Sequence, residues 1–282
     1  MLKKLFKHDM KELSRWGLIM TVIVVITSVI GALALYTVTN ALSDSIGNPY
    51  VASIVDIVSA IALFTSFLAL AAYMFGTIFV ILRRYYTNFF TDEGYLTFTL
   101  PCKKSSLLLS KFFASVIWEF IAVIVLFVCI FIIMLGAPVE VDWNDLSFEL
   151  SQFRNFISFG SLILLIIEYF VLLAVSSMTG ILLMFLAITI GATVAKKHKI
   201  IASIGFYYLI TSVFSLFSSV ATFIPMISVS IRMENTAVEV TSNTMLEMML
   251  PIFGVQILVY AGLGVALFFI NHSFLKNKLN LS

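Results

Sequence analysis

The segment that decides how this chain is organised reads RRYYTNFFTDEGYLTFTLPCKKSSLLLSK and covers residues 83–111. It lies between two long apolar runs and brings charged residues, aromatic residues, a glycine and a proline together. Most of the chain is different: of its 282 residues, 61% are hydrophobic and only 11% are charged. Soluble domains usually carry roughly 25% charged residues, so the composition indicates a membrane protein. We therefore expect the segment 83–111 to meet a partner outside the lipid.

Uncharged runs elsewhere in the chain are long enough to cross a membrane, because about 20 apolar residues span a hydrocarbon core of roughly 30 Å. Such runs form helices, since lipid offers no hydrogen-bond partner to an open backbone. The sequence therefore predicts an all-α integral membrane protein with a single transmembrane domain over residues 1–282. Six spans are expected at about 16–40, 51–82, 107–135, 157–195, 200–228 and 250–274.

Smaller elements are predicted beside the spans. Residues 1–15 place apolar side chains near one helical face and lysines largely on the others, which favours an interfacial helix. The alternative is a positively charged tail that only fixes the topology. The segments 139–156 and 229–249 are acidic and partly apolar, and we expect them to form a small extracellular cap.

The positions of lysine and arginine predict the orientation, because these residues are enriched in cytoplasmic loops. Of the 17 basic residues, 15 lie in the N-terminal segment, in the loops after the second and fourth spans, and in the C-terminal tail. Both termini and the loop 83–106 are therefore expected on the cytoplasmic side of the membrane. The charge pattern gives no reason to expect a nucleic acid as partner.

The chain contains no G-x-x-x-x-G-K-[ST] phosphate-binding loop, no H-E-x-x-H and no G-x-S-x-G. We therefore expect no catalysis by this chain alone, and no cofactor or metal bound by it. Two acidic residues, Glu119 and Glu168, interrupt apolar spans. Carboxylates in spans usually face a bundle interior or a water-filled cavity, so they are candidates for a translocation path or a subunit interface. The alternative is that each one is protonated or hydrogen-bonded and holds helices together.

Within the segment 83–111, Thr91 or Asp92 can cap a short helix that begins near Glu93, and Pro101 requires it to have ended. The basic pairs at 83–84 and 103–104 are expected to anchor the flanks to lipid headgroups. The short element is amphipathic and aromatic. It can fill a groove in a partner and pass motion to both adjoining spans, or it can lie on lipid.

The motif F-x-D-E-G-Y-L-T-F-T-L-P, followed by a basic pair and L-L-L-S-K, resembles the segment after the second span of ABC-2-type transporter permeases. The resemblance implies that this segment is a coupling helix, which seats in a groove of a separate ATPase subunit. It implies two permeases, as a homodimer, and two ATPases that bind ATP and Mg²⁺. By this resemblance, the residues expected to form the coupling helix are Asp92, Glu93, Gly94, Tyr95, Leu96, Thr97, Phe98, Thr99, Leu100 and Pro101.

Within that family, the chain is most similar to permeases that export phenol-soluble-modulin-like amphipathic peptides. The expected function is therefore ATP-driven export of amphipathic or hydrophobic peptides by alternating access, and the resemblance implies a bacterial plasma membrane as the location. Efflux of drugs, lipids or antimicrobial peptides is an alternative within the same class. A membrane sensor or anchor subunit that transports nothing is an alternative outside it.

Overall fold

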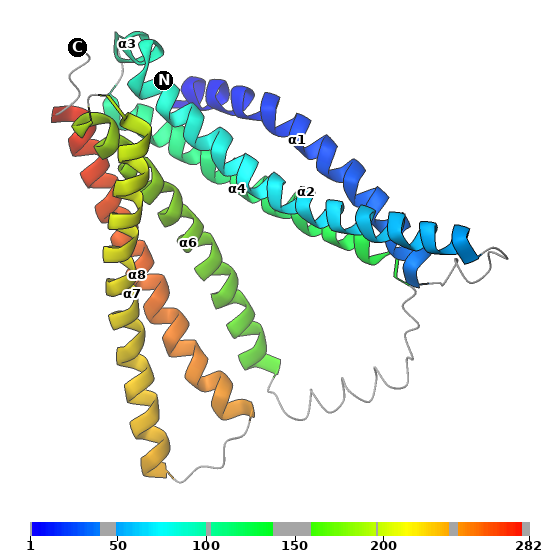
Figure 1. The fold of residues 1–282 in the computed structure, drawn as a ribbon. Coiled ribbons are helices and arrows are strands. Elements are labelled where there is room, and N and C mark those ends of the chain that lie inside the picture. Colours follow the sequence, from blue (N-terminus) through cyan, green and yellow to red (C-terminus); the bar gives the residue numbers. More distant parts are fainter. Residues whose placement is uncertain are drawn as a thin grey trace. The chain divides into compact units, whose positions relative to one another are not determined.

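The computed structural model describes residues 2–39, 49–99, 103–137, 159–195, 197–236 and 242–277 (Figure 1). Every regular element within these ranges is an α-helix. One helix, α3 (Asp92–Thr99), is short. The long helices are α1 (Leu2–Thr39), α2 (Pro49–Phe90), α4 (Lys104–Met134), α6 (Phe159–Val194), α7 (Lys199–Thr236) and α8 (Ser242–Asn277).

Six of these helices are long and apolar enough to cross a membrane, and each overlaps most of one of the predicted spans. Many of their large apolar side chains point outward. On α2, for example, Phe64, Phe75 and Phe79 are 69%, 74% and 64% exposed. Extended apolar surface of this kind marks contact with a membrane or another protein. The six-helix, all-α prediction therefore agrees with the described part of the chain.

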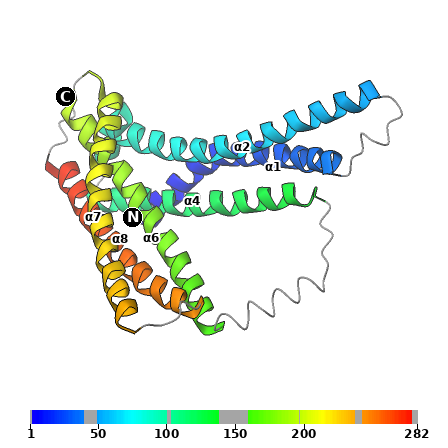
Figure 2. The ribbon, with the colours of Figure 1, turned by 60° about the horizontal axis from the view of Figure 1, so that its bottom comes forward.

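The helices form two compact units, an N-terminal unit over Met1–Glu140 and a C-terminal unit over Val141–Ser282. In the N-terminal unit, α1 lies between α2 and α4 (Figure 2), and α3 packs on α2. In the C-terminal unit, α6 packs on both α7 and α8. Within each unit, the helix ends that carry the predicted cytoplasmic lysines and arginines lie at the same end.

Small residues let the helices of the N-terminal unit approach closely. A Cβ added at Gly17 would lie 1.8 Å from the Trp118 ring, and one at Gly136 would lie 2.0 Å from the backbone oxygen of Ala32. Hydroxyl groups join the same helices, since Ser66 Oγ donates to the Thr27 carbonyl oxygen at 2.9 Å. Small and hydroxyl-bearing residues are typical of helix contacts in membranes.

The C-terminal unit uses the same chemistry. A Cβ at Gly191 would lie 2.5 Å from the backbone of Ser203, where α6 meets α7. Thr179 Oγ1 donates to the Tyr260 carbonyl oxygen at 3.0 Å and joins α6 to α8. We call the end of each unit that carries the predicted cytoplasmic lysines and arginines its basic end. Near the basic end of the C-terminal unit, Thr189 Oγ1 donates to Asn271 Oδ1 at 2.8 Å.

Helix boundaries differ from the predicted spans in three places. Residues 2–15 continue directly into the first span as part of α1, and α2 continues past the arginine pair at 83–84 to Phe90. Of the predicted cap, 139–156 lies outside the described residues. The second cap segment is largely helical, because α7 extends to Thr236 and α8 begins at Ser242. The position of this second cap segment relative to a membrane stays a prediction, as does the position of residues 1–15.

Candidate functional site

The short helix α3 folds back against the end of α2. The Gly94 amide donates to the Thr91 carbonyl oxygen at 2.8 Å and closes the turn between the two helices. A Cβ at Gly94 would lie 2.8 Å from the backbone oxygen of Phe89, so this close approach requires glycine. The Thr91 hydroxyl donates back to the Thr87 carbonyl oxygen at 2.6 Å. Thr91 therefore secures the end of α2.

Aromatic rings hold α3 to α2. The Phe98 ring lies on the Phe89 ring with 5.6 Å between the centroids, and Phe89 in turn contacts Tyr85 edge-on at 5.0 Å. Phe89 and Tyr85 are fully buried. The Lys104 ammonium lies 5.4 Å from the centre of the Phe98 ring, so α4 contributes a cation–π contact. Phe98 is thus an internal anchor of α3.

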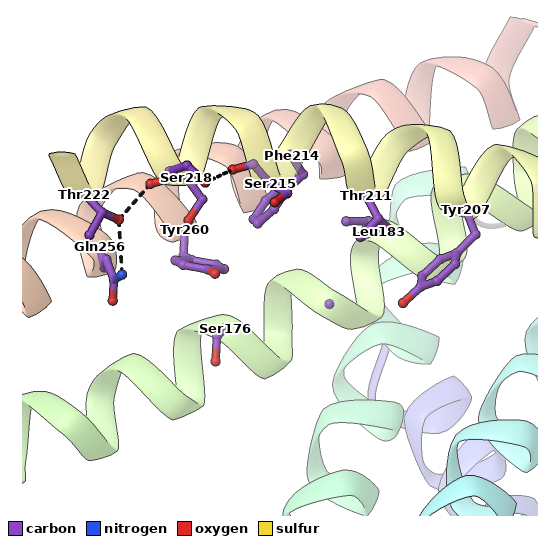
Figure 3. A pocket seen from close by; sticks show the side chains of 12 residues that line it. Ser176, Leu183, Tyr207, Thr211, Phe214, Ser215, Ser218, Thr222, Gln256 and Tyr260 are labelled. Carbon is purple, nitrogen blue, oxygen red and sulfur yellow. Dashed lines mark hydrogen bonds between the residues drawn. The ribbon is translucent and has the colours of Figure 1, made fainter.

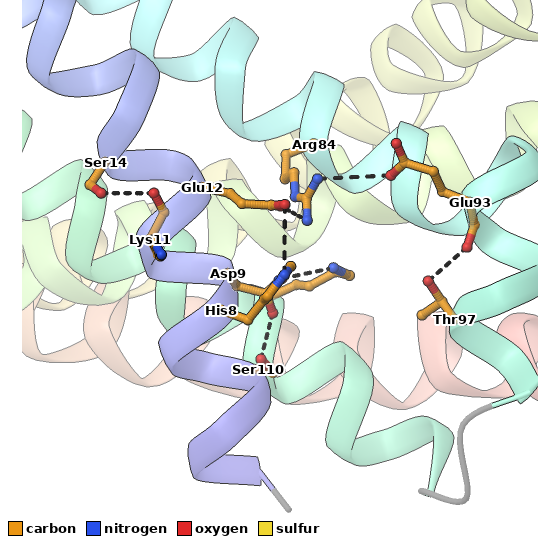
Figure 4. Close-up of polar contacts among 10 residues, drawn as sticks. His8, Asp9, Lys11, Glu12, Ser14, Arg84, Glu93, Thr97 and Ser110 are labelled. Atoms are coloured by element: carbon orange, nitrogen blue, oxygen red, sulfur yellow. Dashed lines mark hydrogen bonds and ion pairs between the residues drawn. The ribbon is translucent and has the colours of Figure 1, made fainter.

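A buried ion pair between Lys111 and Asp9 joins α4 to α1 next to the Phe89 ring, and Figure 4 shows Asp9 with its neighbour Ser110. Lys111 Nζ lies 3.1 Å from Asp9 Oδ1, and Ser110 Oγ donates to Asp9 Oδ2 at 2.6 Å. Asp9 and Lys111 are only 6% and 7% exposed. The Lys111 ammonium also lies 5.3 Å from the centre of the Phe89 ring. Both oxygens of the buried Asp9 carboxylate therefore have partners, and the ion pair contacts the aromatic cluster.

A second set of charges joins α1, α2 and α3. The Arg84 guanidinium forms an ion pair with Glu12 on α1, and its Nη1 lies 3.8 Å from Glu93 Oε2 on α3 (Figure 4). The Arg84 side chain is 22% exposed and that of Glu93 is 56% exposed. The guanidinium of Arg84 therefore faces two carboxylates of the same chain, and the expectation that it anchors to lipid headgroups stays a prediction.

These contacts give α3 two connections to the long helices. One runs through Phe98 and Phe89 to the ion pair between α4 and α1. The other runs through Glu93 and Arg84 to Glu12 on α1. Through these contacts α3 is connected to α1, α2 and α4, while Asp92 on α3 is exposed.

The short helix that the sequence predicts before Pro101 is α3, and its role as a coupling helix stays a prediction. Residues 92–99 form the single helix α3. Leu100 and Pro101 lie outside the described residues, as do the side chains of Tyr95 and Leu96. Sequence reasoning missed the role of Asp9 and Lys111, which are about 100 positions apart and carry no local signal of pairing.

The two acidic residues within spans are half-buried and lie in different units, Glu119 on α4 and Glu168 on α6. Each has one buried carboxyl oxygen, Oε2, without a hydrogen-bond partner in the described part of the chain. Neither has the hydrogen bond that a helix-joining role predicts for this oxygen. Their part in a translocation path stays a prediction.

Searches of protein-family models, of curated proteins and of solved structures found no match to this chain. Within the described residues, no group of three or more histidine, cysteine, aspartate or glutamate side chains could hold a metal ion. Function is therefore inferred from the residues and the geometry of the chain itself.

Proposed function

We propose that this protein is the membrane-spanning permease subunit of an ABC exporter and that α3 is its coupling helix. The observation that carries the proposal is the attachment of α3, which is joined to α2 by Phe98 and to Arg84 by Glu93. A short helix that only lay on lipid would not need connections to three long helices. The resemblance of residues 90–111 to ABC-2-type permeases supports the same reading.

In this proposal, energy comes from a separate ATPase subunit, which binds the ATP and Mg²⁺. Two copies of the permease and two ATPases form the transporter. Movement of the ATPases displaces α3, and the aromatic and ionic contacts pass that displacement to α2, α4 and α1. The membrane helices then alternate between inward-open and outward-open arrangements.

The proposed cargo is an amphipathic or hydrophobic peptide. Supporting this, the six long helices are largely apolar and carry few charges within their spans, which suits such cargo better than sugars or free ions. Efflux of drugs, lipids or antimicrobial peptides would use the same coupling. These alternatives differ from peptide export only in which compound stimulates the ATPase.

The test separates partner binding from transmission of motion. Asp92→Lys changes an exposed charge on α3, and we expect it to reduce co-purification of an ATPase encoded beside the permease gene. Phe98→Ala removes the internal anchor, so we expect the ATPase to remain bound while peptide export falls. Asp56→Lys, the same change on an exposed residue near the other end of α2, is the matched control and should alter neither.

The proposal fails if both α3 variants bind the ATPase and export peptide like the unmodified protein. A chain that binds no ATPase at all would instead support the sensor or anchor alternative. If a drug or lipid, but no peptide, stimulates ATP hydrolysis in the reconstituted complex, the coupling role of α3 stands. The cargo is then that drug or lipid and not a peptide.

A further inference from the structure

The C-terminal unit contains a pocket of about 470 Å³ between α6, α7 and α8 (Figure 3). Six of its 12 lining residues are serine or threonine, and the described lining includes no charged side chain. Phe214 and Tyr260 contact each other across it with 5.2 Å between their ring centroids. The pocket therefore offers neutral hydrogen-bonding groups and aromatic surface.

The polar lining extends along most of one membrane span. On α7 it begins at Tyr207 and reaches Thr222, both within the apolar part of that helix. At 1.5 Å per residue, this stretch is about 22 Å long. The hydrocarbon core of a bilayer is roughly 30 Å thick. A ligand that matches this lining must carry polar groups along its length.

The hydroxyl groups of the pocket lining on α7 differ in what they already bond. Ser219 and Thr222 each donate to the carbonyl oxygen four residues earlier, at 2.8 Å. Ser215 also lines the pocket and is exposed, so a ligand can reach it. Thr211 Oγ1 has no hydrogen-bond partner among the described residues, but it is buried and does not face a ligand directly.

The far end of the pocket is held in place. Gln256 Nε2 on α8 donates to Thr222 Oγ1 on α7 at 3.2 Å (Figure 3). This hydrogen bond orients the amide and joins the two helices at the pocket wall.

The length and neutrality of the lining distinguish between ligand classes. A lipid or detergent concentrates its polar atoms at one end, whereas a peptide carries amides and polar side chains throughout. Unpaired charge inside a membrane is expensive, and the described lining has no counter-charge to offer. We propose that this pocket binds a peptide segment through an uncharged face of serine, threonine, asparagine, glutamine or backbone amide groups. As a description of cargo recognition, the proposal rests on the peptide-export function above.

The test uses the full chain, purified in nanodiscs without an ATPase, so that binding is measured apart from transport. Cys102→Ser removes one native thiol, and Cys129 is retained because it is fully buried. In that background, Ser218→Cys places a thiol on the pocket wall. Ser212→Cys is the matched control, because it lies on the same helix, is exposed and does not line the pocket. The rate of maleimide labelling reports occupancy.

Three synthetic leucine-alanine helices of equal length serve as probes. One carries a serine-glutamine stripe, one a lysine-glutamate stripe and one no polar stripe, and monoolein provides a neutral lipid. At ten times its Kd, the serine-glutamine peptide should slow labelling at Ser218→Cys about tenfold and leave Ser212→Cys unchanged. The proposal is overturned if the charged peptide, the apolar peptide or monoolein protects equally, or if no probe protects.

A second variant tests the hydroxyl groups of the lining. Ser215→Ala removes one exposed hydrogen-bonding group from the pocket wall. The thermal stability of the ligand-free protein should change little, while affinity for the serine-glutamine peptide should drop about five- to tenfold. Unchanged affinity contradicts a role of this hydroxyl group in binding. If the peptide protects Ser218→Cys but is not exported, the binding site stands and the export function is refuted. If the peptide is exported without protecting Ser218→Cys, the export function stands and the binding site is refuted.

Discussion

The basic end of the N-terminal unit and the pocket of the C-terminal unit use polar residues in opposite ways. At the basic end, the buried Asp9 carboxylate is matched on both oxygens, by Ser110 and Lys111. In the pocket, the described lining groups are neutral. Matched charges fix helices relative to one another. Neutral hydrogen-bonding groups let a site accept an uncharged ligand inside a membrane, where unpaired charge is expensive.

The largest expected effect comes from breaking the buried ion pair of the basic end. Lys111→Met leaves Asp9 buried and unpaired, and removing one partner of such a pair costs about 3–5 kcal/mol. The free energy of unfolding in mixed micelles measures the loss. The control, Lys11→Met on an exposed position of α1, should change little. Asp9→Asn combined with Lys111→Met should recover much of the stability, and its failure to do so would contradict the pairing.

The next effect is local to α3. Removing a buried phenylalanine side chain costs about 3–5 kcal/mol, and Phe98 is half-buried, so Phe98→Ala should cost about half as much. Because the anchor fixes α3 to α2, amide hydrogen exchange over residues 92–99 should accelerate. Phe79→Ala, which removes an exposed ring of α2, is the control. Equal exchange in both variants would show that Phe98 does not hold α3.

Tight packing in the C-terminal unit should be tested away from the pocket. Gly191→Ala places a methyl group against the backbone of Ser203, and overpacking of this kind costs about 1–3 kcal/mol. Gly205→Ala has open space around the new methyl group and should be neutral or slightly stabilising. Thermal unfolding compares the two. A tolerated Gly191→Ala would mean that α6 and α7 separate more readily than the contact implies.

The smallest effect concerns the half-exposed charges between α1, α2 and α3. Arg84→Gln removes the ion pairs with Glu12 and Glu93, and exposed pairs contribute only about 0.2–1 kcal/mol. Hydrogen exchange over α3 should increase modestly, and the difference should shrink in about 1 M salt because screening weakens the pairs. Arg83→Gln, on the exposed neighbouring arginine, should have no effect on α3. A difference that persists in high salt would indicate that Arg84 acts through packing.

Local patterns predicted the elements of this chain well. Uncharged runs located all six long helices, and Asp92 together with Pro101 bracketed α3. The second span, expected to end at residue 82, is part of a helix that continues past Arg83 and Arg84 to Phe90. Glu12 and Glu93 pair with Arg84 along this extension.

The arrangement of the candidate site could not be predicted in the same way. Asp9 and Lys111 meet only because α1 and α4 pack together, and nothing in either local sequence specifies that contact. From the sequence, Phe98 is expected to contact a partner protein. In the structure, its ring packs on Phe89 of the same chain. The pocket did leave a signal, since Thr211, Ser215, Ser218 and Thr222 recur every three or four residues on α7. That spacing places hydroxyl groups along one side of a helix.

The length of α2 has a consequence for where α3 can be reached. With 42 residues at 1.5 Å each, α2 is about 63 Å long. A bilayer with its headgroups is about 40–45 Å thick, and even a steep tilt of about 40° leaves roughly 48 Å of this helix along the normal. Part of α2 must therefore stand clear of the membrane. A water-soluble protein that pushes on α3 would act at the end of a rigid arm, where a small angular change of α2 produces a large displacement.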